Sequence, residues 1–536
     1  MDTTEDMRIS PKFEDDKHES RIDLPEAEAD LGSSVSNKFF NVDCVQQHLS
    51  TKLMGQNIVY KEMTGTTMDD AAEQAVLGVS PGTAFIAEIQ TKARGSRSKK
   101  WDADQCGNLY VSFVLHRDEK LRGFVDRFDV EVASSLAVLK VLQDLGLKNA
   151  QIKWPNDICI RGHKVAGFLV EDRGLANDQL ESHKGKAIYI LGIGLNVNSD
   201  IRRHPLLHSI ATSIQCELSG RVTSREVLFS QICNSLEEYL SMDRTKIFSL
   251  FSKNQMISVD DSVRVYAENE QRKSFAALLK EINYNWNVVL KDTEGRLLKG
   301  SSQDFSLRPN PAKTVYVYRG DSQHWSGNQL LETLMALVDI SKTNVVCLSD
   351  NELLEGRWSS DAVAIVLGDM TSNSDDAKRR DVIQKFVQSG GSFFGIRRGC
   401  NLFLDNVLEF SNRTDNQEKI QCSVANVVLS DEELQLSKIG LVASEDSLRF
   451  NCNKFPGGTD VVQYDSETDD VKCGAAIYIF KYGSGRACLC GLNLECTYMN
   501  VQEHFIITPE CLSRIKASVY ARDQLIQKIL CKLGIN

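Results

Sequence analysis

The 536-residue chain has no excess of positive charge and no long apolar run. It contains 62 Lys and Arg residues against 73 Asp and Glu residues, which gives a formal net charge of -11. Nucleic-acid binders usually carry a basic surface for the phosphates, so this charge balance argues against that class. No apolar stretch approaches the roughly 20 residues that cross a bilayer, so we expect no membrane-spanning helix.

The 15 cysteines also lack the spacing of a disulfide framework or a metal site. Their number is odd, they are scattered, and no Cys-x-x-Cys pair occurs. We therefore expect reduced thiols and a cytoplasmic location.

The first 36 residues predict a disordered acidic tail. Residues 1–31 contain eleven Asp or Glu and four Lys or Arg, few aromatics and two prolines. Such a segment cannot bury enough apolar surface to offset the entropy of an ordered chain. It has the wrong charge for a mitochondrial transit peptide and no apolar core typical of a secretory signal, so neither is expected.

Residues 37–256 predict an α+β domain with a mixed sheet backed by helices. A helix is expected from Thr66, and another from Phe128 to Leu142 with a glycine cap at Gly146. Short runs of branched and aromatic residues predict strands at 84–89, 109–115, 151–154, 165–170 and 187–193.

Two further regions follow. Residues 257–309 contain short strand patterns separated by Gly, Asn and Asp, which predict a small β-barrel. Pro309-Asn310-Pro311 is a stiff connector to residues 313–536. There, strands expected at 315–318, 345–348, 362–368 and 392–396, with a helix at 376–388, predict a largely parallel, doubly wound sheet. The whole chain is thus an α/β multidomain protein.

One short segment has the polar residues that a reaction at phosphorus needs. It reads Lys153-Trp154-Pro155-Asn156-Asp157, and Lys164 follows seven residues later. The proline fixes the backbone, the Asn-Asp pair offers one neutral and one anionic side chain, and the lysine returns on the next strand. These residues can hold a phosphate ester beside a nucleophile. A lone lysine is nevertheless most often a surface cation, and an aspartate often caps a turn.

A second polar segment is the basic loop that runs from Gln90 to Trp101. Its Arg94 can donate two hydrogen bonds to phosphate oxygens. The small residues of the loop would let it close over a nucleotide, and we expect Trp101, which follows them, to be exposed. A basic Gly/Ser loop is equally typical of a solvated surface.

These residues and their spacing resemble the biotin–protein ligases, which attach biotin to a lysine of biotin-dependent carboxylases. The resemblance covers roughly residues 55–308. It implies that Lys164 contacts the biotin carboxylate and the α-phosphate, that Asp157 orients the acceptor lysine and helps take up its proton, and that Arg94 acts in the loop over the adenylate. The implied substrate- and nucleotide-binding residues are Thr66, Thr67, Met68, Gln90, Gly95, Ser96, Arg97, Trp101, Lys153, Asn156, Gly167, Gly192 and Gly194. Trp154 is expected in the core.

The loop departs from the family pattern. The family reads Gly-Arg-Gly-Arg-x-Gly where this chain reads Ala93-Arg94-Gly95-Ser96-Arg97-Ser98. Ser96 stands where the family has an arginine that helps retain the adenylate, although Arg97 could substitute if the loop shifts by one residue. Without such a shift we expect the intermediate to escape more readily, which a measurement of free biotinyl-AMP per turnover would test.

Residues 313–500 resemble the glutamine amidotransferase-like domain of fungal and animal relatives of these ligases. That domain usually precedes the ligase part, whereas here it follows it. Arg397 stands at the position of the nucleophilic cysteine, and Asn493 replaces the histidine of the His-x-Glu pair that ends at Glu495. Without a thiolate and an imidazole the triad has no nucleophile and no base, and Cys400 should point along the helix that follows the turn.

The sequence thus predicts an ATP-dependent biotin–protein ligase. Biotin would attack the α-phosphorus of ATP, and a lysine of a biotin-carrier domain would then attack biotinyl-AMP. The resemblance implies ATP, Mg²⁺ and biotin, with an SH3-like barrel after the catalytic core and no assignable metal ligands. Open alternatives are a lipoate or octanoyl ligase-type enzyme and a non-catalytic protein that binds biotin or a carboxylase. A repressor is disfavoured because the acidic amino-terminal segment has no helix-turn-helix pattern. Carboxylase choice and oligomeric state stay open.

Overall fold

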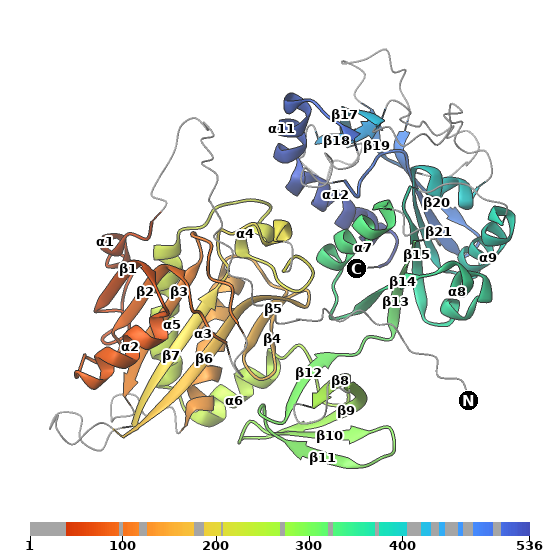
Figure 1. The fold of residues 1–536 in the computed structure, drawn as a ribbon. Coiled ribbons are helices and arrows are strands. Elements are labelled where there is room, and N and C mark those ends of the chain that lie inside the picture. Colours follow the sequence, from red (N-terminus) through yellow and green to blue (C-terminus); the bar gives the residue numbers. More distant parts are fainter. Residues whose placement is uncertain are drawn as a thin grey trace, which may run out of the picture. The chain divides into compact units, whose positions relative to one another are not determined.

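Three β-sheets organise the part of the chain that this computed structural model describes (Figure 1). The structure describes residues 39–95, 100–116, 126–175, 187–204, 207–267, 274–319, 325–369, 375–404, 420–429, 439–444, 459–464, 475–496 and 505–535. The predicted acidic tail, residues 1–36, lies outside them.

The first sheet has seven strands in the order β1-β2-β3-β7-β6-β5-β4. The strands are β1 (Ile58–Thr64), β2 (Ala84–Gln90), β3 (Leu109–His116), β4 (Ala150–Lys153), β5 (Asp157–Ile160), β6 (His163–Leu175) and β7 (Ala187–Leu195). Only β1 and β2 pair in parallel, and every other pairing is antiparallel. The mixed sheet expected from the sequence is therefore present, with two strands, β1 and β5, that the sequence patterns did not indicate.

Helices cover both faces of this sheet. The helices are α1 (Val42–Val45), α2 (Thr67–Val76), α3 (Arg127–Asp144), α4 (Ile214–Glu217), α5 (Arg225–Leu240) and α6 (Arg244–Lys253), with a 3₁₀ turn, η3, at Ile201–Arg203. Alternate side chains of each strand point to opposite faces. Phe85 and Ile190 pack with α2, whereas Ile86 and Leu191 join the main core together with α3 and α5.

Local sequence signals explain where two of these helices begin and end. Thr66 is the N-cap of α2, and its side chain accepts a hydrogen bond from the Met68 amide. Asp126 forms a capping box at the start of α3, and Gly146 follows the end of that helix with φ +94°. Both the predicted threonine cap and the predicted glycine stop are confirmed.

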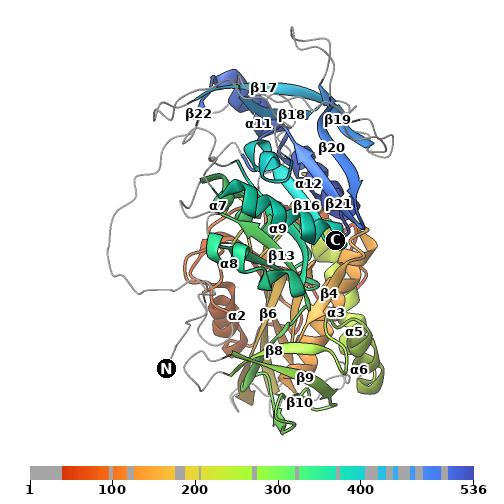
Figure 2. The same cartoon turned by 90° about the vertical axis from the view of Figure 1, so that its right-hand side faces the viewer.

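The second sheet has five antiparallel strands in the order β11-β10-β9-β8-β12, some of them visible in Figure 2. They are β8 (Ser262–Ala267), β9 (Ser274–Ile282), β10 (Val288–Asp292), β11 (Leu297–Gly300) and β12 (Phe305–Pro309). Buried residues such as Trp286 and Val288 belong to the same apolar core as the first sheet. The Trp286 indole donates to the Asp129 carboxylate of α3 at 3.0 Å.

The third sheet follows the order β14-β13-β15-β16-β21-β20-β19-β17-β18, with β22 paired to β17. Its strands are β13 (Lys313–Tyr318), β14 (Thr343–Leu348), β15 (Ala362–Leu367), β16 (Ser392–Ile396), β17 (Ile420–Leu429), β18 (Ile439–Ser444), β19 (Thr459–Tyr464), β20 (Ala475–Tyr482), β21 (Gly485–Cys490) and β22 (Phe505–Ile506). The run from β14 to β21 is parallel, and the described strands beyond it on that path are antiparallel.

Helices lie on both faces of the parallel part. They are α7 (Trp325–Leu337), α8 (Asp350–Glu355), α9 (Asp376–Gln388), α11 (Pro509–Ala517) and α12 (Val519–Lys532), with 3₁₀ turns η4 (Arg357–Ser360) and η5 (Arg397–Leu402). The α7 and α12 side chains share one apolar cluster with the sheet, and the α8 and α9 side chains share another. We refer to residues 313–535 as the second α/β domain.

Two expectations concern features of the whole chain. In the described ranges, no helix is both long and apolar enough to cross a bilayer. Twelve cysteines in the described ranges carry free thiols.

Candidate functional site

A pocket opens on the first sheet between α2, the loop before β3, and the strands β6 and β7. Most of the predicted binding residues meet there. Its lining includes Thr66, Thr67, Met68, Gln90, Arg94, Gly95, Trp101, Asp157, Lys164, Gly167, Gly192 and Gly194. Segments that are as much as 128 positions apart in the sequence thus supply one concave surface, which is typical of a ligand site.

Lys164 and Asp157 form an ion pair at the pocket wall. The Lys164 Nζ lies 2.6 Å from Asp157 Oδ1, and Lys153 Nζ lies 3.5 Å from Asp157 Oδ2. Burial alone would raise the pKa of Asp157, but the two neighbouring ammonium groups hold that pKa below its ordinary value. The carboxylate is therefore ionised at neutral pH, and the Lys164 side chain keeps about a third of its surface exposed for a further partner.

Asn156 lies behind this pair and does not line the pocket. Its Nδ2 donates to Glu131 Oε2 at 3.0 Å and to the Phe168 carbonyl at 3.3 Å. Glu131 belongs to α3, and burial raises the pKa of its carboxyl to about 8. The sequence motifs do not include Glu131, although it is the one charged residue between Val130 and Leu139. A single acidic residue in an otherwise apolar helix could have identified it as a buried polar group.

The opposite end of the pocket is a small hydroxyl and amide cluster. Gln90 Oε1 accepts from the Thr67 amide at 2.8 Å and from the Thr67 hydroxyl at 3.2 Å. The Thr67 hydroxyl also contacts the Ser112 hydroxyl at 2.8 Å, and Ser112 is a second lining residue that the sequence did not indicate. These groups offer donors and acceptors suited to a neutral, polar ring.

Glycines form the floor of the pocket because Trp101 and Met68 lie directly on the strands. Gly167 of β6 pairs with Gly194 of β7. A Cβ added at Gly194 would meet the Trp101 ring at 2.7 Å, and one at Gly192 would meet Met68 Sδ at 2.6 Å. The expectation that Trp101 is exposed is wrong, since its indole is partly buried over these glycines, 5.0 Å from the Lys164 ammonium.

Arg94 is held by carboxylates in this structure. Its Nε donates to Glu171 Oε1 at 2.9 Å, and its Nη2 lies 2.8 Å from Asp69 Oδ1. These hydrogen bonds, that to Glu171 foremost, raise the pKa of the guanidinium. Ser96 and Arg97, the other predicted loop residues, lie outside the described residues.

The three predicted remnants of an amidotransferase triad meet in the second α/β domain. Arg397 directly follows β16, is buried, and has φ +48°. Its Nη1 lies 3.3 Å from Asn493 Oδ1 and 3.4 Å from Asp369 Oδ2. Glu495 accepts a hydrogen bond from the Ser326 hydroxyl at 2.6 Å, and burial raises the pKa of Glu495 to about 7.

Cys400 lies inside the core beside this cluster. Its thiol contacts the Gly395 carbonyl at 3.2 Å, and burial raises the pKa of the thiol well above its ordinary value. A thiolate is disfavoured there.

Residues 62–185 match the family model described as the biotin/lipoate A/B protein ligase family. The bifunctional ligase/repressor BirA of Bacillus subtilis is 32% identical over 191 residues, which are 35% of this chain and 55% of that protein. The biotin–[acetyl-CoA-carboxylase] ligase of Mycobacterium tuberculosis is 25% identical over 271 residues, or 48% of this chain and 94% of that protein.

Coverage differs among the relatives. The chain spans about half the length of the Bacillus proteins and about a third of the Escherichia coli one. Among solved structures, the biotin protein ligase of Aquifex aeolicus in complex with biotin and ATP is 25% identical with a TM-score of 0.39, covering 48% of this chain and all of that one. The matched segment contains α2, the basic loop, Asp157 and Lys164. Residues 62–185, which supply most of the lining of this pocket, thus belong to the biotin/lipoate A/B protein ligase family.

Proposed function

We propose that this protein is an ATP-dependent biotin–protein ligase. The observation that carries the proposal is the Lys164–Asp157 pair, which faces a pocket with hydroxyl and amide groups at one end and a glycine floor beneath. Most of the residues that line this pocket lie within the matched family segment. The relatives named above as ligases support biotin as the small substrate.

The first step joins biotin to AMP. An oxygen of the biotin carboxylate attacks the α-phosphorus of ATP, a new P–O bond forms, and pyrophosphate leaves. Negative charge grows on the phosphoryl oxygens, and Lys164 is placed to neutralise it. Arg94 would exchange Asp69 and Glu171 for phosphate oxygens, because its guanidinium forms equally good bidentate bonds with either anion.

The second step transfers the biotinyl group to a lysine of a biotin-carrier domain. The acceptor amine must lose a proton before it attacks the acyl carbon, and AMP then leaves with both bonding electrons. Asp157 is ionised and lies beside the reaction centre, so it can orient the acceptor ammonium and help to take up its proton. No covalent intermediate with the enzyme is needed.

Magnesium would enter with the triphosphate. In the part of the chain that the structure describes, no group of three His, Cys, Asp or Glu side chains could hold a metal ion. Mg²⁺ usually keeps several waters and binds through substrate phosphates, which suits a pocket without a carboxylate cage. When bound, it would screen the phosphate charge.

A transfer assay tests this function directly. The purified full chain is incubated with ATP, Mg²⁺, labelled biotin and an apo biotin-carrier domain. We expect label on the carrier with the wild type and with Lys140→Ala, whose lysine pairs with Asp144 on the surface of α3. We expect none with Lys164→Ala. Equal transfer by Lys164→Ala and wild type would contradict the proposal.

The same assay separates the alternatives. Labelled lipoate or octanoate replaces biotin, together with a lipoyl carrier domain. Transfer of either acid in preference to biotin would identify a lipoate-type ligase. Biotin binding without transfer by the wild type would identify a non-catalytic biotin-binding protein.

For the second α/β domain we propose an amidotransferase-like fold that has lost hydrolysis. Arg397 follows a central parallel strand in a left-handed backbone conformation, the place where that fold carries its nucleophile. Its guanidinium is engaged with Asp369 and Asn493, so neither a nucleophile nor a base remains there. The twelve free thiols in the described ranges suit the cytoplasmic location that we also propose.

A further inference from the structure

The turn that connects the two strands of the ion pair touches the second α/β domain. Asp157 begins β5 and Lys164 is the second residue of β6. The hairpin turn between the two strands is Arg161-Gly162, and His163 is the first residue of β6, so we refer to these three residues as the Arg161–His163 turn. Whatever fixes this turn therefore also constrains the two strands that carry the proposed catalytic groups.

The turn binds the carboxyl end of α7. His163 Nε2 donates to the Met335 carbonyl at 2.7 Å, and Arg161 Nη1 donates to the Leu337 carbonyl at 2.7 Å. The Ile340 amide in turn donates to the Arg161 carbonyl at 3.1 Å. The last carbonyls of a helix have no partner within it and carry partial negative charge, so a guanidinium and an imidazole N–H are well suited to them.

Gly162 allows this close approach. Its φ is +83°, and an added Cβ would lie 2.5 Å from Ile340 Cγ1 and 2.9 Å from the Ser341 amide nitrogen. Any side chain there would have to push the turn and the second domain apart.

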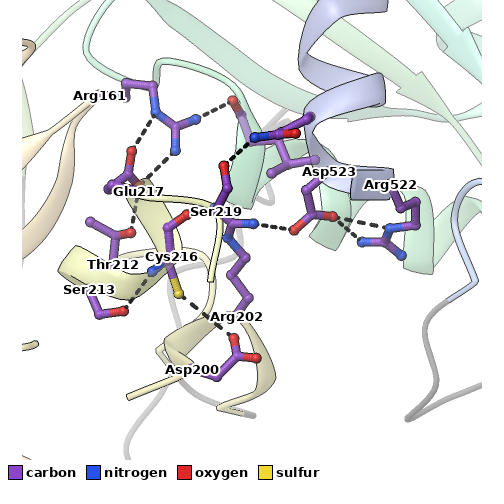
Figure 3. A network of polar contacts seen from close by, with 12 residues as sticks. Arg161, Asp200, Arg202, Thr212, Ser213, Cys216, Glu217, Ser219, Arg522 and Asp523 are labelled. Carbon is purple, nitrogen blue, oxygen red and sulfur yellow. Dashed lines mark hydrogen bonds and ion pairs between the residues drawn. The ribbon is translucent and has the colours of Figure 1, made fainter. Parts of the chain in front are cut away.

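A second contact lies at the segment that precedes α4, shown in Figure 3. Arg202 binds the Asp523 carboxylate of α12, and Asp523 also accepts from its neighbour Arg522 at 2.6 Å. Arg202 further donates to the Cys216 carbonyl of α4, and Glu217 of the same helix pairs with Arg161 at 2.8 Å. The two contacts thus share α4.

The segment fixed by α4 runs alongside Lys164. The Lys164 amide donates to the Ile210 carbonyl at 3.0 Å, and the Thr212 amide donates to the Lys164 carbonyl at 2.9 Å. The Thr212 hydroxyl donates to Glu217 at 2.6 Å. The backbone of Lys164 therefore lies between a turn that contacts the second domain and a segment that is linked to that turn through Glu217.

We propose that the second α/β domain positions Lys164 for catalysis by clamping the Arg161–His163 turn and the Arg202 segment. Arg161, Gly162 and His163 are positioning residues, since they act through the backbone of Lys164. This inference rests on the proposed ligase function for its kinetic readout but not for its structural one.

The first test compares two glycine variants of the full chain. Gly162→Ala introduces a Cβ against Ile340, whereas Gly295→Ala is a matched control, with φ +86° and its nearest contact at 3.9 Å. Both glycines have a positive φ, so alanine introduces similar backbone strain at the two positions. We expect amide hydrogen exchange at Lys164 and Thr212 to rise roughly tenfold or more in Gly162→Ala and to stay at the wild-type level in Gly295→Ala. Equal exchange rates in the two variants would overturn the proposal.

Kinetic constants distinguish a positioning role from a purely structural one. In Gly162→Ala we expect kcat for adenylate formation to fall about tenfold with the KM for biotin nearly unchanged, because a displaced ammonium weakens the transition state more than the ground state. Unchanged kcat together with faster exchange would refute positioning. If the wild type forms no adenylate, the ligase function fails, while the exchange result still decides whether the domain clamps Lys164.

A second variant changes the contact with Arg202 on the side of the second α/β domain. Asp523→Asn removes the carboxylate between Arg202 and Arg522, and Asp350→Asn removes a comparable Asp–Arg pair with Arg379 inside the same domain. Thermal unfolding verifies that both variants are folded. We expect faster exchange at Lys164 only in Asp523→Asn, and the same exchange rate in both variants would contradict the clamp.

Discussion

Three charges at one point of the first sheet set the chemistry of the pocket. Lys153 and Lys164 share the carboxylate of Asp157, and the net positive charge of this group suits an anionic transition state. Only Lys164 combines this pairing with a place in the pocket lining. We therefore expect different tasks for the two lysines of this motif.

Substituting Asp157 should separate the two steps of the reaction. In Asp157→Asn we expect adenylate formation to stay within about tenfold of the wild type, since Lys164 is still present. We expect transfer from preformed biotinyl-AMP to fall by roughly a hundredfold, because the acceptor ammonium loses its anionic partner. Single-turnover assays of each step measure the two effects. An equal loss in both steps would mean that Asp157 acts only by holding Lys164.

Glu131 should make the stability of the protein depend on pH. Its carboxyl has a pKa of about 8 in the folded protein, above the ordinary value of 4.5. The folded state then binds more protons than the unfolded state between these values, so stability falls as the pH rises through this window, by about 1 kcal/mol per pH unit from this group. Urea unfolding should show that slope reduced in Glu131→Gln. Asp144→Asn, at the exposed end of the same helix, should keep it, and a slope in Glu131→Gln equal to that of the wild type would disprove the assignment.

Among the elements, the strongly patterned ones were predictable from the sequence. The helix at α3 has an apolar stripe with a capping residue before it and glycine after it, and the central strands β3 and β7 are nearly continuous apolar runs. By contrast, β1 is a largely exposed strand that contains Lys61 and Glu62, and β5 has four residues directly after a Pro-Asn step. Both are defined by pairing with neighbours rather than by a local pattern.

The position of Trp101 was not predictable for a related reason. Its indole lies on Gly194, which is far from it in sequence and has no side chain. The residues of the basic loop alone do not indicate that its tryptophan packs on a distant strand. The glycines had an equally good explanation as ordinary strand and turn residues, until the structure placed an aromatic ring above them.

Filling the pocket floor should displace that ring. A Cβ in Gly194→Ala would overlap the Trp101 indole, so we expect a change in tryptophan fluorescence and biotin affinity weaker by roughly tenfold, or about 1.4 kcal/mol. Titration calorimetry and fluorescence measure the two effects. Gly65→Ala is the control, because an added Cβ there meets nothing within 4 Å. Unchanged biotin binding in Gly194→Ala would exclude this floor from the biotin site.

At the scale of the whole molecule, the sequence indicated two α/β regions but not how they meet. The contacts of Arg161 with Leu337 and of Arg202 with Asp523 join residues 176 and 321 positions apart. Neither arginine belongs to a recognisable motif. Long-range polar contacts of this kind depend on the folded surfaces of both domains, and no local pattern predicts them.

The second α/β domain should not hydrolyse glutamine. Arg397 and Asn493 leave no nucleophile or base, and the nearby Cys400 is buried with its thiol pKa raised. We expect no ammonia release from glutamine by the full chain, measured with a coupled dehydrogenase assay. Ammonia release that disappears in Cys400→Ser would show that this thiol is a nucleophile after all.

We propose above that Lys164 acts in forming an adenylate from biotin and ATP. Biotin-dependent exchange of labelled pyrophosphate into ATP measures that step alone, without a carrier domain. We expect exchange by the wild type and by Lys140→Ala, and its loss in Lys164→Ala. Exchange in Lys164→Ala at the wild-type rate, or no biotin-dependent exchange by the wild type, would contradict it.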